Sequence, residues 1–194
     1  DIVFSQHEAG RGFAWLRDAY RMFSRARVPW LLIALTYYVV MGVIDIVPYV
    51  GKLAYAVLKP VFAVGFLAAA WAQERGAAPR VRQLFSGFSS NLWSLIPLGI
   101  FLLAGATAAI LATPLVDGGQ LLDVMSGRVR LTEEMIRTGD LQLAMMFAAI
   151  CSLPTLLALW FAPGLVVFQD ANALTAVAAS LRAALANWRP LLVY

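Results

Sequence analysis

Long apolar runs constrain this chain more than any other feature of its sequence. Residues 28–47 and 53–71 each carry a single charged side chain, and residues 83–116 and 141–169 carry none. A helix needs about 20 apolar residues to cross the hydrocarbon core of a membrane. Only 13% of the chain is charged, about half the share of a soluble domain, which excludes a soluble enzyme, a disordered tail and a disulfide-stapled secreted domain. The sequence therefore predicts a multi-pass membrane protein.

These runs predict helices and not strands. In lipid only helices and closed barrels satisfy their own backbone, and the ten-residue alternation of a barrel strand is not visible. The predicted fold class is an all-α, polytopic transmembrane helical bundle. We expect residues 1–194 to form a single transmembrane domain with four full spans and a truncated fifth, at about 28–47, 53–72, 92–115, 141–167 and 190–194.

Basic residues divide unequally between the two sides of such a bundle. The N-terminus and the segments 73–91 and 168–190 together hold ten Lys and Arg against five Asp and Glu, and the opposite side holds five against six. The positive-inside rule places the first side, with the N-terminus, in the cytoplasm. Four tryptophans fall at the cytoplasmic ends of spans, as in an aromatic belt, and packing in a core is the alternative: Trp30, Trp71, Trp93 and Trp188.

Three segments share one plan, in which a basic amphipathic helix is followed by a tryptophan and then by a span. The predicted interfacial helices cover about 11–27, 80–91 and 173–187. Their arginines are predicted to contact lipid headgroups: Arg11, Arg17, Arg21, Arg25, Arg27, Arg80, Arg82, Arg182 and Arg189. The pattern predicts an internal repeat of interfacial helix, span, outer connection and span, with chance similarity between amphipathic helices as the alternative.

Four stretches of the sequence carry a resemblance: 11–23 (RGFAWLRDAYRMF), 117–119 (DGG), 161–166 (FAPGLV) and the later Ser180 with 187–189 (NWR). They resemble a family of beta-proteobacterial inner-membrane proteins. The resemblance covers nearly the whole chain and implies a six-helix integral membrane protein of unknown function. More distantly, the chain is similar to the membrane domain attached to some bacterial glycerophosphodiester phosphodiesterases. The resemblance supplies no catalytic residues, and the soluble phosphodiesterase domain is absent from this sequence.

Residue types that carry chemistry are scarce. His7, the single histidine, lies in a polar N-terminal stub and is expected to be a solvated surface residue, while Cys151 lies in an apolar run. The sequence contains no metal-ligand spacing, phosphate-binding glycine loop or nucleophile with a base. We expect no catalytic, cofactor-binding or metal site, and no nucleic-acid binding, because lipid phosphate competes for arginines on interfacial helices.

Two features lie toward the outer side. The segment 117–140 is too long for a tight turn, and Thr132 is expected to cap a short helix that begins at Glu133. This segment either docks a partner or simply covers the bundle. In the third span, small residues at 104, 105, 108 and 109 permit close contact between helices, within the chain or between chains.

Asp45 and Lys59 are the charges inside the spans. The short turn between the first two spans makes them a hairpin, which sets these two residues within about a helical turn of each other. They either form an intramembrane pair, which offsets the cost of a charge in lipid, or extend separately to the outer headgroups.

These features predict a non-enzymatic protein of the bacterial inner membrane that serves as a scaffold or accessory subunit. Its expected partners are membrane lipids and either subunits of a larger complex or further copies of itself. The alternative is a transporter or channel for a small or lipid-like substrate. A transporter needs several polar side chains that meet near the membrane midplane, and the spans offer few: Lys59, Thr107, Ser152 and Thr155.

Overall fold

A computed structural model describes residues 5–90 and 92–194, and every regular element within them is helical. The all-α fold class is confirmed. The elements in chain order are α1 (Gly10–Arg25), α2 (Arg27–Asp45), α3 (Val50–Glu74), the 3₁₀ helix η1 (Val81–Phe85), α4 (Ser86–Ser90), α5 (Leu92–Leu111), α6 (Pro114–Asp117), α7 (Gln120–Met125), α8 (Glu133–Thr138), α9 (Asp140–Trp160), α10 (Ala162–Phe168), α11 (Ala173–Ala186) and α12 (Trp188–Val193).

Four of these segments are long and apolar enough to cross a membrane. They are α2, α3, α5 continued through α6 (Leu92–Asp117) and α9 continued through α10 (Asp140–Phe168). Each begins and ends close to the bounds expected from hydropathy. The chain packs as two compact units, one of residues up to Ile100 together with Leu157–Tyr194, the other Phe101–Leu156.

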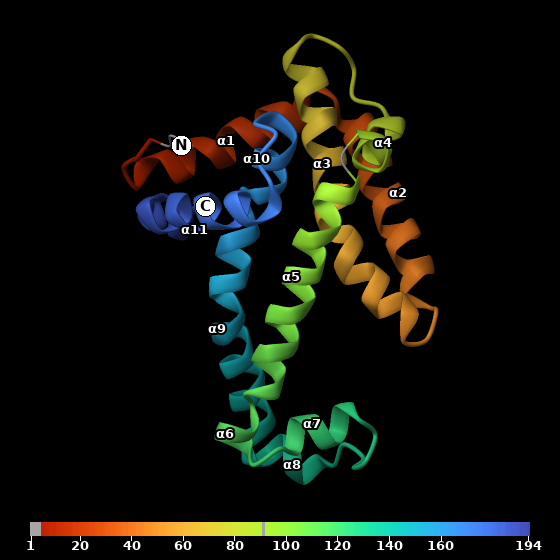
Figure 1. The fold of residues 1–194 in the computed structure, drawn as a ribbon, viewed down its shortest axis with the longest axis vertical. Coiled ribbons are helices and arrows are strands. Elements are labelled where there is room, and N and C mark those ends of the chain that lie inside the picture. The colour runs from red at the N-terminus through yellow and green to blue at the C-terminus, as the bar shows by residue number, and fades with distance from the viewer. Residues whose placement is uncertain (1–4, 91) are drawn as a thin grey trace. The chain divides into compact units, whose positions relative to one another are not determined.

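The first unit is organised around α3, which packs against α2, η1, α4 and α10. Figure 1 shows α2 and α3 as a hairpin, with α1 running across one end of it. Phe62 and Leu84 are fully buried in the cluster between α2, α3 and η1. At Gly65, an added Cβ would collide with the carbonyl of Leu84, so glycine is what lets η1 lie directly on α3.

The predicted interfacial helix 80–91 differs from expectation in form. It is a 3₁₀ turn followed by the short helix α4, and residue 91 lies outside the described part of the chain. Leu84 and Gly87 are buried against α3, whereas Arg80 and Arg82 are exposed. The 3₁₀ form is tighter than the α form and suits such short segments.

The break between α9 and α10 is filled by a side chain from another helix. Pro163, near the start of α10, has no N–H to continue the helix. Across the break, Phe161 N donates to Ser180 Oγ at 2.9 Å, and Ser180 Oγ donates to the Leu157 carbonyl at 3.1 Å. The buried hydroxyl from α11 therefore stands where one backbone hydrogen bond of the helix would have been.

The start of the predicted fifth span forms α12, which packs against α1. Gly12 on α1 is buried, and a Cβ there would collide with the carbonyl of Pro190. Just before α12, Asn187 accepts a hydrogen bond from His7 N at 2.8 Å and donates to the carbonyl of Ser5 at 3.1 Å. A span beyond residue 190 stays a prediction.

The second unit, Phe101–Leu156, holds the end of the third span, the start of the fourth span and the segment between them. Gly105 on α5 lies directly against the Thr155 side chain of α9, so part of the small-residue stripe is used within the chain. Asp117 accepts hydrogen bonds from Gly119 N and Leu121 N and thereby holds the start of α7. Thr132 caps α8 by accepting from Met135 N at 3.4 Å, which confirms the predicted cap.

Candidate membrane-interface site

The helix α1 presents an apolar stripe that this chain does not cover. Phe13 and Tyr20 are 71% and 65% exposed, and Leu16 and Phe23 on the same stripe are exposed as well. The contact of α1 with α12 lies on another face of the helix, where Gly12 is buried. An exposed apolar stripe flanked by arginines is typical of a helix that lies in the plane of a membrane interface.

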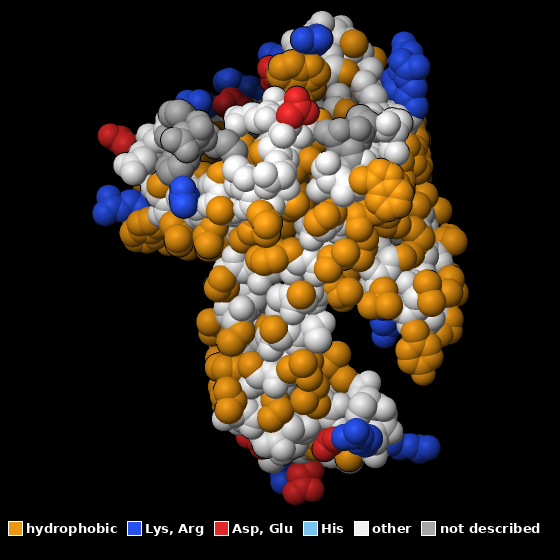
Figure 2. All heavy atoms as spheres, in the orientation of Figure 1, with side chains coloured by type: hydrophobic (Ala, Val, Ile, Leu, Met, Phe, Trp, Pro, Cys, Tyr) orange, Lys and Arg blue, Asp and Glu red, His pale blue; other side chains and the backbone are white. Residues whose placement is uncertain are grey.

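All nine arginines predicted to contact headgroups are exposed. Within the described residues, Arg21 has an ion pair, to Asp18 at 3.7 Å, and Arg189 lies over the Trp188 ring at 5.5 Å. The other seven have no acidic partner in that part of the chain: Arg11, Arg17, Arg25, Arg27, Arg80, Arg82 and Arg182. Figure 2 shows Lys and Arg side chains near α1, near α4 and near α7 and α8, and apolar side chains over the visible face of the α2–α3 hairpin.

The tryptophans predicted as an aromatic belt divide into two kinds. Trp71, Trp93 and Trp188 are exposed, as a belt requires. Trp30 is half-buried, and its indole N–H donates to Gln73 Oε1 at 2.7 Å. The Gln73 amide in turn donates to the Met22 carbonyl at 2.7 Å, so Trp30 and Gln73 join α1, α2 and α3 at the point where α1 ends.

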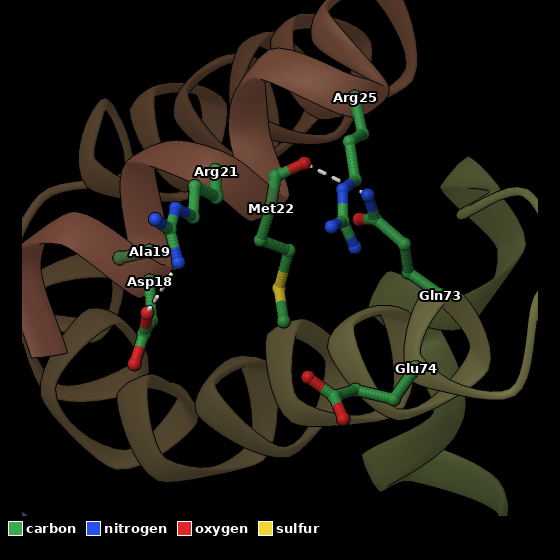
Figure 3. A pocket seen from close by; sticks show the side chains of 7 residues that line it. All are labelled: Asp18, Ala19, Arg21, Met22, Arg25, Gln73 and Glu74. Atoms are coloured by element: carbon green, nitrogen blue, oxygen red, sulfur yellow. Dashed lines mark hydrogen bonds and ion pairs between the residues drawn. The ribbon is translucent and has the colours of Figure 1, made fainter.

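A cavity of about 470 Å³ lies between α1 and the end of α3. Five of its seven lining residues are polar or charged: Asp18, Ala19, Arg21, Met22, Arg25, Gln73 and Glu74 line it. Figure 3 shows these side chains around the cavity, with the Asp18–Arg21 ion pair on one wall and Glu74 on another. The spacing of residues 18, 21, 22 and 25 marks one face of α1, but no sequence signal connects that face with residues 73 and 74, so the cavity was missed from sequence.

A second cavity, of about 290 Å³, is lined mainly by aromatic side chains: Trp15, Asp18, Trp160, Phe161, Leu191 and Tyr194. The Tyr194 ring packs edge-on to Trp15 and to Trp160, with centroids 6.2 and 6.1 Å apart. Asp18 belongs to both cavities. This cluster also was not anticipated from sequence, because α1, α9 and α12 bring its members together.

The structure does not bring Asp45 and Lys59 together. Both are exposed, and the ion pairs within the described residues are Arg21–Asp18 and Arg128–Asp123. The Lys59 ammonium instead lies over the Tyr55 ring, 4.9 Å from its centroid. Of the two readings of these charges, the geometry favours separate residues.

The remaining chemistry-bearing residues have local partners. The His7 ring is hydrogen-bonded to Ser5 Oγ at 3.1 Å and packs edge-on to Trp15. Cys151 is a half-buried free thiol. Within residues 5–90 and 92–194, no group of three or more His, Cys, Asp or Glu is placed to hold a metal ion.

Comparison with known proteins finds a relative in a bacterium. The chain is 29% identical over 168 residues to a probable inner membrane protein of Burkholderia thailandensis. The match covers 84% of this chain and 62% of the relative, so the chain spans less than two thirds of that protein's length. No family model matches the chain, and no solved structure matches it. The four membrane-capable helices agree with the prediction of a multi-pass membrane protein, and the relative's name is of the same kind.

Proposed function

We propose that this chain is a non-enzymatic scaffold or accessory subunit within a larger inner-membrane assembly. The same proposal includes six spans, a cytoplasmic N-terminus, and contacts of the interfacial arginines with lipid headgroups. The more distant resemblance to the membrane domain of glycerophosphodiester phosphodiesterases stays a prediction.

The observation that carries this proposal is how little of each span the chain itself covers. The share of the apolar window buried inside the chain is 11% for α2, 22% for the third span and 11% for the fourth. Such surfaces face lipid or the helices of other proteins. On α5, Ala104 and Ala108 form an exposed small-residue face one turn long, while Gly105 and Ala109 face inward. Small exposed faces let another helix approach closely.

The polar side chains of the spans support a scaffold over a transporter. Ser152 Oγ donates to the Ala149 carbonyl of its own helix, and Thr36 Oγ1 donates to the Leu32 carbonyl in the same way. Lys59 lies over Tyr55. Each of these polar groups has its partner within its own helix. A transport site instead gathers polar groups from several helices around a substrate.

The test is purification of the full-length protein in a mild detergent, followed by mass spectrometry of retained proteins and lipids. We expect a protein at fixed stoichiometry, either a different subunit or a second copy. The double variant A104L/A108L should lose it, because leucine holds helices apart. The matched variant A104S/A108S keeps the residues small and should retain it. A monomer that retains only a small molecule would contradict the scaffold and support transport.

A further inference from the structure

We propose that the cavity between α1, the end of α9 and α12 binds an alkylated ammonium group, of the kind carried by a phosphocholine headgroup. The observation is a set of aromatic rings around one carboxylate, in a cavity of about 290 Å³. All residues of the site come from this chain, so it stands whether or not the chain joins a larger assembly.

The rings form walls at steep angles to each other. The Tyr194 ring makes interplanar angles of 72° with Trp15 and 85° with Trp160. Trp160 remains about half exposed beside the cavity. A cation over the face of a Trp or Tyr ring is attracted by the negative face of the ring, and quaternary ammonium groups are recognised by aromatic cages of this kind.

The carboxylate of Asp18 supplies the complementary charge. Its Oδ1 pairs with Arg21 at 3.7 Å, and no ion pair or hydrogen bond within the described residues uses its Oδ2. Asp18 also lines the neighbouring cavity, together with Arg21 and Arg25. A phosphodiester attached to the ammonium therefore has guanidinium donors beside it, and charge-assisted bonds to phosphate favour arginine. A methylated ammonium suits the rings better than a bare one, since it carries few N–H donors to satisfy.

Binding is measured on the full-length protein in a nonionic maltoside detergent, by the change in tryptophan fluorescence. The probes are tetramethylammonium chloride, soluble phosphocholine, and nanodiscs of phosphatidylcholine or phosphatidylglycerol. We expect a saturable change with tetramethylammonium that equal concentrations of sodium chloride do not produce. Tighter binding in phosphatidylcholine nanodiscs than to soluble phosphocholine identifies a lipid headgroup as the source, and the reverse order identifies a soluble ligand. Both orders support the ammonium site.

Matched variants make the assignment specific. D18N and W15L should each weaken tetramethylammonium binding about tenfold, and D18E should restore most of it by returning the charge. W93L removes an exposed tryptophan outside the cavity and should leave affinity unchanged. Thermal unfolding of D18N, D18E and W93L should match the parent, since Asp18 and Trp93 are exposed. Absence of saturable binding to any ammonium probe, or unchanged affinity in D18N, would overturn the proposal.

Discussion

At the scale of single residues, side chains that replace backbone hydrogen bonds have the clearest energetic consequence. Ser180 satisfies both Phe161 N and the Leu157 carbonyl at the α9–α10 break. Removing its hydroxyl leaves the Phe161 N–H and the Leu157 carbonyl without this partner. We expect S180A to lower the free energy of unfolding by about 1–3 kcal/mol, measured by denaturant titration in detergent.

The matched control for this change is S152A. The Ser152 hydroxyl donates to the carbonyl three residues earlier in its own helix, where the helix already satisfies its backbone. We expect that variant to lose less than about 0.5 kcal/mol. Equal losses in the two variants would show that the hydroxyl at position 180 does not support the break.

The charges of the first hairpin provide a second residue-scale prediction. Because Lys59 lies over Tyr55 and not beside Asp45, the losses of stability in D45N and K59M should add, with a coupling below about 0.5 kcal/mol. K59M and Y55L should instead be coupled by about 0.5–1 kcal/mol. Two double-mutant cycles by thermal unfolding in detergent check this. Strong coupling between Asp45 and Lys59 would instead show that the two residues form an intramembrane pair.

Local signals in the sequence predicted local structure well. Thr132 followed by two glutamates predicted the cap of α8. The contacts of Ser180 and Gln73 could not be predicted from the sequence, because each depends on which helices pack together. Neither residue differs in sequence from an ordinary polar side chain on an amphipathic helix.

At the scale of helices, span positions followed from length and hydropathy, since few other solutions exist for 20 apolar residues in lipid. The division of the fourth apolar run into α9 and α10 was harder to see. Pro154 and Pro163 both lie in that run, yet α9 continues through Pro154 and ends before Pro163. What distinguishes the second proline is the hydroxyl of Ser180 beside the break, which is a tertiary feature.

The amphipathic helix α1 yields the prediction at this scale. A peptide of residues 8–27 should bind vesicles of anionic lipid as a helix, because each arginine near such a surface contributes about 1 kcal/mol. Circular dichroism and vesicle sedimentation measure this. Most of the binding should be lost at high salt.

The control peptide carries Gln in place of all five arginines and keeps the apolar stripe. It should bind anionic and neutral vesicles to the same weak extent. If the parent peptide binds neutral vesicles as tightly as anionic ones, its arginines serve some purpose other than headgroup contact.

At the scale of the whole molecule, the ten-to-five division of basic residues predicts orientation. In a C151S background, a cysteine in place of Ser126 should react with an impermeant thiol reagent added outside spheroplasts, and a cysteine in place of Ala77 should not. Both positions are exposed, so access depends on the side of the membrane. The opposite labelling would reverse the orientation. Charge counting supplied this prediction, whereas both cavities depend on packing between distant helices and were not visible from sequence.

The hydrogen bond from His7 to Asn187 joins positions 180 residues apart. This separation determines how long after His7 its partner is synthesised. At about 5–20 residues per second, a ribosome needs roughly 9–36 s to make the intervening chain. Throughout that interval α1 exists without α12, the helix on which Gly12 later packs. The apolar stripe of α1 and its arginines are made before α12. On the interfacial placement proposed above, the membrane surface holds α1 in place until α12 has emerged.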